Sequence, residues 1–196
     1  MPTTLADPAL DQLFRQARTR NGWREEPLGE GVIQQIYDLA KFGPTSANIS
    51  PARFVWATST EAKEKLAALA TPTNGVKIRQ APVTVIIGYD LDFPELIPKL
   101  FPHNPGAKDW FNDPVARETA AFRNGTLQGA YLMLAARALG LDCGPMSGFS
   151  NAAVDEAFFA GTRIKSNFIC SIGHGTDENL FGRSPRLSFD EASRIV

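Results

Sequence analysis

The sequence predicts a single domain that combines helices and strands in layers, an α+β or layered α/β fold. The chain has 196 residues, of which 43% are hydrophobic, enough for one substantial core. Helical and strand-like hydrophobic patterns alternate along its whole length without an internal repeat, as layered mixed folds require. We therefore expect one domain over residues 1–196.

The first half shows both periodicities. Apolar residues recur at steps of three or four where we expect helices, as Leu10, Leu13 and Phe14 do, and they form short β-branched runs where we expect strands. Ser59 or Thr60 is the expected cap of the third helix. In chain order, the pattern predicts a helix over 7–18, a helix over 29–42, a strand over 51–57, a helix over 61–70 and a buried strand over 83–88.

The composition changes at residues 90–114, where five prolines alternate with aromatic residues. This composition predicts an excursion or lid with short helical pieces at most. The longest helix should follow over 115–139, with Leu127, Tyr131, Leu134 and Ala138 as its core stripe and Gly140 at its end. The remaining expected elements are a strand over 141–144, a helix over 151–159, a strand over 167–173 and an extended or helical tail from 183.

Composition excludes several classes of partner. Lys and Arg number 20 against 21 Asp and Glu, for a net charge of -1, which disfavours nucleic-acid and membrane-surface binding. Two distant cysteines and two histidines indicate no metal site and fit a reducing compartment. No window reaches the roughly 20 apolar residues of a membrane span, and the N-terminus lacks an export signal. We expect a soluble, cytoplasmic protein.

Known catalytic motifs are absent. The chain has no phosphate-binding G-x-x-x-x-G-K-[ST] loop, no H-E-x-x-H, no G-x-S-x-G elbow and no dinucleotide-binding G-x-G-x-x-G after a strand. Hydrolytic triads also lack histidine, because only His103 and His174 are present. A cofactor that carries its own reactive atom would explain why the chain lacks these catalytic motifs.

Two arginine-rich segments match the phosphate end of a flavin nucleotide. One contains Arg18, Thr19 and Arg20, and the other contains Arg183 and Arg186. Guanidinium forks bind terminal phosphates well, and the two segments could converge if the chain ends meet. The alternative is that they are solvated surface residues.

Three further segments match the sugar and ring of such a nucleotide. Residues 43–51 gather hydroxyl and carboxamide groups, residues 144–149 offer backbone N–H groups for the flavin N5, and Lys77 would stabilise a reduced flavin. Ordinary turns and an exposed lysine remain the alternatives. The candidate residues are Pro44, Thr45, Ser46, Asn48, Pro145, Met146, Ser147, Gly148, Asn74 and Lys77.

Taken in order, these segments resemble the nitroreductase superfamily over almost the whole chain. Within it, the sequence is similar to the short malonic semialdehyde reductase subgroup, the RutE-like proteins of pyrimidine breakdown. The matching blocks are Arg18-Thr19 with 21–24, 43–48 with 50–53, 121–124, 138–142 with 144–149, and 185–189.

The resemblance implies an intertwined homodimer with shared active sites. Each subunit would contain a central, mostly antiparallel mixed sheet flanked by helices. It implies that FMN is the cofactor. NADPH or NADH would reduce the FMN, and the reduced FMN would then pass a hydride to a small-molecule substrate. Arg18, Thr19, Arg20 and Arg186, with Arg183, would bind the phosphate, and Ser46 and Asn48 would come from the partner subunit. Ser147 and Gly148 would lie near N5, and Asn74 and Lys77 at the pyrimidine edge. Asn124 and Gln128, four residues apart on one helix, would face the site.

By the same resemblance we expect reduction of malonic semialdehyde to 3-hydroxypropionate, with Ser46 or water as proton donor. Its carboxylate needs a cation, for which Arg53, Lys99, Lys108, His103 and Arg123 are candidates, although surface charges of this kind are usually only solvated. Two alternatives stay open: a broad-specificity nitro or quinone reductase, and a flavin-binding protein without turnover.

Overall fold

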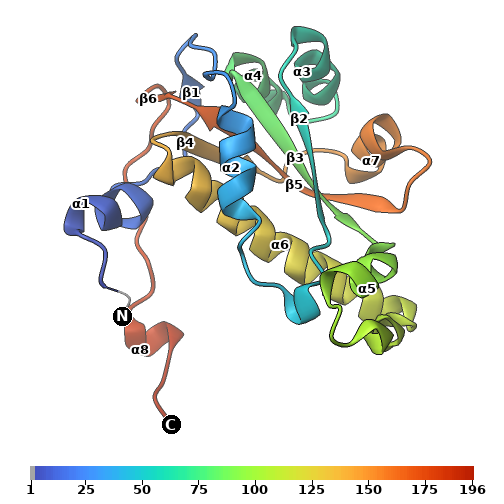
Figure 1. The fold of residues 1–196 in the computed structure, drawn as a ribbon. Coiled ribbons are helices and arrows are strands. Elements are labelled where there is room, and N and C mark those ends of the chain that lie inside the picture. The colour runs from blue at the N-terminus through green and yellow to red at the C-terminus, as the bar shows by residue number, and fades with distance from the viewer. Residues whose placement is uncertain (1–2) are drawn as a thin grey trace.

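The computed structural model describes residues 3–196, so the first two residues of the expected domain lie outside it. Its centre is a four-stranded sheet in the order β2-β3-β5-β4, in which all neighbours run antiparallel (Figure 1). The strands are β2 (Ala52–Ala57), β3 (Val83–Asp90), β4 (Asp142–Met146) and β5 (Ile164–Gly173). The expected antiparallel sheet is confirmed.

The sequence of β3 explains its central place. Every residue from Val83 to Tyr89 is buried, and Ile86 pairs with Val55 on one side and Ile169 on the other. A β-branched run of this kind suits a strand that is covered on both faces.

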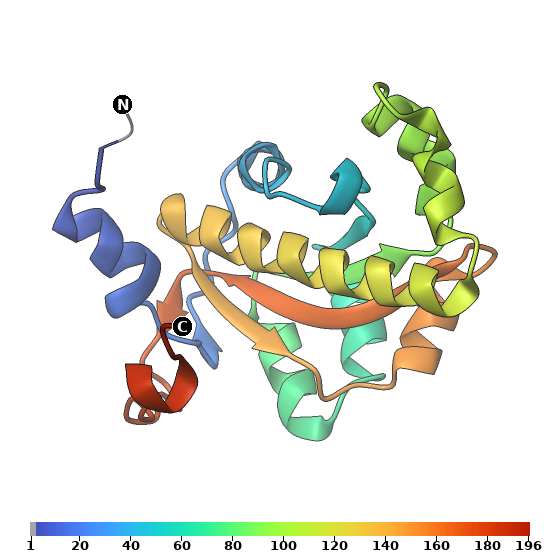
Figure 2. The same ribbon diagram turned by 90° about the horizontal axis from the view of Figure 1, so that it is seen from below.

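Helices cover both faces of the sheet (Figure 2). One face carries α2 (Val32–Ala40) and α6 (Pro114–Ala138), and the other carries α3 (Thr60–Ala67), α4 (Pro72–Gln80) and α7 (Asn151–Phe159). Each face has its own buried apolar cluster, so the expected layering is confirmed.

The proline-rich excursion consists of three short helical pieces, η3 (Phe93–Leu96), α5 (Ile97–Leu100) and η4 (Pro105–Phe111), as its composition predicts. They enclose a third apolar cluster that also takes in Ile49 from the loop after α2. The excursion and that loop therefore share one core.

The start of the chain differs from the prediction, whereas the tail is extended and partly helical as expected. The first helix is split into α1 (Asp7–Leu10) and a wider π-helical turn, η1 (Asp11–Arg15), and β1 (Gly22–Trp23) pairs with β6 (Gly175–Thr176) in a small unpredicted sheet. The tail carries α8 (Phe189–Ala192) and extends away from the body (Figure 1). Every residue from 181 to 196 is exposed in the single chain.

The predicted core stripe of α6 is wrong. Leu127 and Tyr131 are 46% and 39% exposed, whereas Gly129 faces the sheet, where an added Cβ would lie 2.5 Å from Phe168. Small residues let the helix approach the sheet closely, and Leu132 packs in the core, whereas Leu127 and Tyr131 point outward. The same helix is apolar on both faces, so periodicity alone could not choose between them.

α4 was not predicted, because Pro72-Thr73-Asn74-Gly75 has the composition of a turn. The proline instead occupies the first turn of the helix, where its missing N–H costs nothing. Gly75 is needed there, since a Cβ would come within 3.0 Å of the Ala67 carbonyl oxygen.

Within residues 3–196, no helix is both long and apolar enough to cross a membrane. The same part of the chain contains no cluster of three or more His, Cys, Asp or Glu side chains suited to a metal ion.

Candidate functional site

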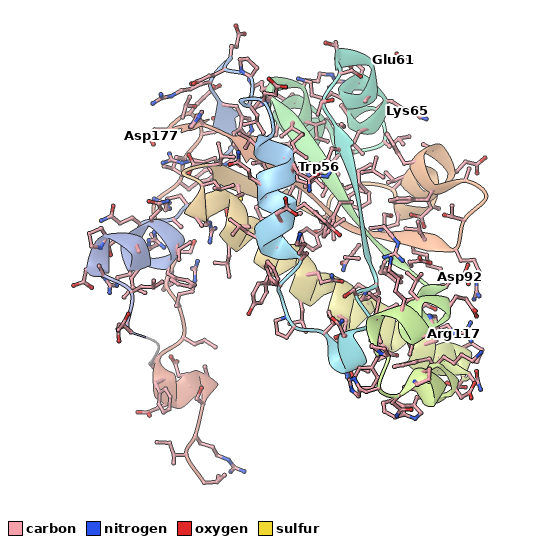
Figure 3. All side chains as sticks on the ribbon, in the orientation of Figure 1. Trp56, Glu61, Lys65, Asp92, Arg117 and Asp177 are labelled. Atoms are coloured by element: carbon pink, nitrogen blue, oxygen red, sulfur yellow. The ribbon has the colours of Figure 1, made fainter. Side chains whose placement is uncertain are left out.

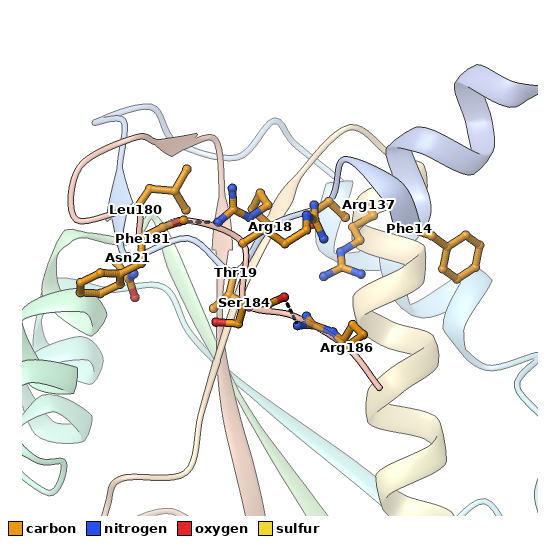
Figure 4. A pocket seen from close by; sticks show the side chains of 12 residues that line it. Phe14, Arg18, Thr19, Asn21, Arg137, Leu180, Phe181, Ser184 and Arg186 are labelled. Atoms are coloured by element: carbon orange, nitrogen blue, oxygen red, sulfur yellow. Dashed lines mark hydrogen bonds between the residues drawn. The ribbon is translucent and has the colours of Figure 1, made fainter. Parts of the chain in front are cut away.

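The two arginine-rich segments meet at one cavity of about 630 Å³ (Figure 4). Arg18 comes from the segment after η1, Arg183 and Arg186 come from the tail, and Arg137 comes from the last turn of α6. The predicted convergence of the two chain ends therefore occurs, and α6 adds a fourth guanidinium group.

None of these four side chains has a carboxylate partner among residues 3–196; their contacts are backbone carbonyls. Arg183 donates to Ala17 O at 3.0 Å, Arg186 to Ser184 O at 2.9 Å and Arg137 to Leu13 O at 3.2 Å, and Arg18 donates to Phe181 O. Four uncompensated positive charges around one cavity favour a strongly anionic group such as a phosphate.

Arg137 was missed by sequence reasoning. A cation in the last turn of a helix is ordinarily explained by the helix dipole, so its position carried no distinctive signal. Only the packing of η1 against the end of α6 brings it to the cavity.

Thr19 lines the same cavity, whereas Arg20 does not. The Arg20 guanidinium pairs with Asp177 and lies 3.5 Å from Asp142, and it also donates to Thr176 O at 3.1 Å. Both of its hydrogen bonds use Nη1, and its Nε is buried without a hydrogen-bond partner among the described residues. In the single chain Arg20 therefore links β4 to the segment after β6, and its contact with the phosphate stays a prediction.

A second cavity, of about 530 Å³, adjoins the first through Asn21 and Phe181, which line both. Lys77 of α4 lines this second cavity and has no ion-pair partner among the described residues. Both volumes lie within the roughly 300–1,000 Å³ typical of small-molecule sites.

The segment after β4 packs against α4 as the ring-binding prediction requires. Asn74 Nδ2 donates to Gly148 O at 3.1 Å, and an added Cβ at Gly148 would lie 2.7 Å from the same nitrogen. The N–H groups of Ser147 and Gly148 donate to no acceptor in residues 3–196, so a backbone donor pair is free there. Pro145 lies within β4, and the Met146 side chain is buried in the core.

The loop with Pro44, Thr45, Ser46 and Asn48 lies elsewhere in the same chain. Its short helix η2 (Ser46–Asn48) is held by Asn124, 13 residues before Arg137 on α6, or about 20 Å along the helix axis. Figure 3 shows Asp177, the partner of Arg20, on the opposite side of the molecule from Asp92 and Arg117, which flank the excursion. One chain alone does not bring this loop to the arginine cavity.

Asn124 and Gln128 line neither of these two cavities of the single chain. Both are buried, at 4% and 7% exposure, and their side-chain oxygens accept from the backbone N–H groups of the loop at Ser46 and Ala52, each at 2.8 Å. Both side chains face the loop in the single chain, and their expected place beside the flavin stays a prediction.

The predicted substrate anchors divide into engaged and free cations. Arg53 pairs with Asp90 at 2.7 Å, and His103 stacks on Phe101. Arg123 lines a groove with Glu118, whose pKa is lowered by its hydrogen bond to Lys165 and by the charge of that lysine. Lys99 and Lys108 of the excursion have no carboxylate partner among the described residues.

The sequence comparisons give one consistent result. The profile of the family described as Nitroreductase matches residues 15–174. A Caulobacter vibrioides (strain NA1000) protein is 69% identical over 192 residues, 98% of each chain, and a Stenotrophomonas maltophilia (strain R551-3) protein is 61% identical over 197 residues, 100% of each. Both are provisionally named NADH dehydrogenase/NAD(P)H nitroreductase.

Solved structures share the fold. A protein of Exiguobacterium sibiricum 255-15, described as a nitroreductase in complex with FMN, superposes with a TM-score of 0.87 at 22% identity over 100% of both chains. A Bacillus subtilis protein described as a nitroreductase gives 0.85 at 18% identity, over 97% of this chain and 100% of that one.

Proposed function

The chain belongs to the nitroreductase family, and from this premise we propose that it is an FMN-dependent reductase that oxidises NADPH or NADH and reduces malonic semialdehyde to 3-hydroxypropionate. The enzyme class, a flavin-dependent NAD(P)H oxidoreductase, is that of the family. The observation that carries the cofactor assignment is the cavity at which four guanidinium groups lack carboxylate partners.

The residues present fit FMN along its length. Arg18, Arg137, Arg183 and Arg186 would hold the phosphate, because bidentate guanidinium contacts suit its oxygens. The neighbouring cavity supplies Lys77, and Asn74 and the free N–H groups of Ser147 and Gly148 lie together beside α4. When bound, FMN would accept a hydride from the nicotinamide and pass it to the substrate.

The chain's own groups then have defined tasks. The Lys77 ammonium would stabilise negative charge on the pyrimidine edge, and the two backbone donors would orient the ring. A proton for the product alkoxide would come from Ser46 or from water. A cation of the excursion, Lys99 or Lys108, would hold the substrate carboxylate, since Arg53 is engaged by Asp90.

We also propose a homodimer with shared sites. The loop at Ser46 lies about 20 Å along α6 from the arginine cavity, so a second copy must supply it if it serves the cofactor. The outward apolar residues of α6, including Leu127 and Tyr131, and the exposed tail over 181–196 offer the surface for such a partner. A two-fold pairing is the commonest way to bury such a face.

The substrate is tested by steady-state rates. The proposal expects kcat/KM for malonic semialdehyde to exceed that for a nitroaromatic compound, with NADPH or NADH as reductant. No turnover of the semialdehyde, together with rapid turnover of the nitroaromatic, would favour the broad-specificity nitro or quinone reductase, which the names of the relatives support.

A flavin-binding protein without turnover is the alternative from another class. It predicts a yellow protein whose colour neither nicotinamide bleaches.

A further inference from the structure

We infer that Asn124 and Gln128 are positioning residues that hold the loop over residues 44–52 in a strained shape, and that they thereby control FMN binding in the partner subunit's site. The inference rests on the proposed function, because it needs FMN and a shared dimeric site. Neither residue lines either cavity of the proposed cofactor site in its own chain.

The loop is strained. Ala47, Asn48 and Ser50 have φ angles of 47°, 51° and 39°, the left-handed region that L-residues with a side chain avoid. Each such residue raises the energy of the loop, so surrounding contacts must impose the shape.

Two of those contacts come from buried amides of α6. The Asn124 side chain accepts from Ser46 N at 2.8 Å and donates to Ala120 O at 2.8 Å, while Gln128 accepts from Ala52 N at 2.8 Å. The two amides thus fix the loop near both of its ends. Both side chains are more than nine-tenths buried, so water cannot replace them without opening the core.

Local contacts complete the brace. Ser50 N donates to Thr45 Oγ1 at 3.1 Å, Arg53 donates to Ser50 O at 3.1 Å, and Asn48 Nδ2 donates to Leu100 O at 2.9 Å. These bonds lie within the loop, the next strand and the excursion. Ile49 packs near Ala121 of α6, but among the described residues only Asn124 and Gln128 form hydrogen bonds between the loop and this helix, whose far end carries Arg137 of the arginine cavity.

Loss of either side-chain amide should therefore weaken the binding of FMN. Without its acceptor, the loop relaxes toward ordinary φ values, and FMN must then restore the strained shape at the expense of its own affinity. We expect Asn124→Leu and Gln128→Met each to raise the FMN Kd roughly 10- to 100-fold. Thr84→Val is the matched control, because it removes a buried hydrogen bond to Ser171 of 2.8 Å far from the loop and should leave Kd unchanged.

The decisive experiment is a mixed dimer, prepared with two affinity tags from one Asn124→Leu chain and one Arg18→Ala/Arg186→Ala chain. In a shared-site dimer, the first chain's arginines meet the second chain's intact loop, so one site per dimer is whole. We expect each variant homodimer to bind FMN weakly and the mixed dimer to bind one FMN per dimer with wild-type affinity.

A mixed dimer without a tight site overturns the inference, since defects that act within one chain leave no whole site. Wild-type affinity in both the Asn124→Leu and Gln128→Met homodimers overturns it as well. If the wild-type protein itself binds no FMN, the proposed function fails, which is a distinct result.

A second variant guards against simple misfolding. In Asn124→Asp, a protonated carboxyl reproduces both native bonds, whereas an ionised one places a negative charge against Ala120 O. Its FMN affinity, divided by that of wild type at each pH, should be near one at low pH and fall as pH rises. A ratio that does not change with pH contradicts the positioning role.

Discussion

Replacing Arg18 by glutamine removes one of four guanidinium groups from the arginine cavity while keeping a polar, uncharged side chain there. A charge-assisted hydrogen bond contributes about 1.5–3 kcal/mol, so the Kd for FMN should rise roughly 10- to 100-fold. Riboflavin has the same ring and sugar without the phosphate, and its Kd should stay within about twofold of wild type. The assay is titration of the apo-protein with each flavin, followed by the quenching of flavin fluorescence.

Arg24→Gln is the matched control. Arg24 is exposed, does not line the arginine cavity, and its loss changes the net charge by the same amount. Equal loss of FMN and riboflavin affinity in Arg18→Gln, or an equal loss of FMN affinity in Arg24→Gln, would refute the assignment of this cavity to the phosphate.

Three further predictions test other parts of the structure. Leu127→Glu, on the outward face of α6, should convert the dimer to a monomer with weak FMN binding in analytical ultracentrifugation, and an unchanged dimer contradicts that interface. The hydrogen bond that the Cys170 thiol makes to Cys143, together with its burial, raises the pKa of Cys170, and both thiols are buried, so a thiol reagent at pH 8 should label them only after unfolding; rapid labelling of the native protein counts against this packing. Burial, with the nearby Glu118, raises the pKa of Tyr89 to about 12, so the folded protein keeps a proton that the unfolded chain releases near pH 10. Denaturant unfolding should therefore show that the free energy of unfolding falls as pH rises from 10 to 12, and that it falls less in Tyr89→Phe. An equal dependence on pH in both proteins would contradict the raised pKa of Tyr89.

The fold was predictable where local and tertiary signals agree. The buried run of β3 and the Ser59 cap of α3, which accepts from Ala62 N, are both visible in the sequence, and both are present. α4 was missed because a proline and a glycine that serve helix start and close packing also mark turns. The pattern favours the face of α6 with Leu127 and Tyr131 as its core face, but that face points outward, and only the packing on the sheet reveals the small residues opposite Phe168.

The site was predictable in its parts but not in its assembly. The arginines of both chain ends were expected to meet and do, because the tail lies beside the segment after η1. The ion pairs of Arg20 and the contribution of Arg137 depend on which side chains fold next to them, and no local pattern encodes that. The spacing of Asn124 and Gln128 predicts that both face the cofactor site. In the single chain, their side-chain oxygens instead accept hydrogen bonds from the backbone of the loop.

The central claim, that this chain is an FMN-dependent reductase, is tested most directly by anaerobic stopped-flow absorbance of the purified protein reconstituted with FMN. We predict that NADPH or NADH bleaches the yellow flavin band and that malonic semialdehyde then restores it, with 3-hydroxypropionate formed in an amount equal to the flavin reoxidised. A protein that retains no FMN, or whose band neither nicotinamide bleaches, would contradict it.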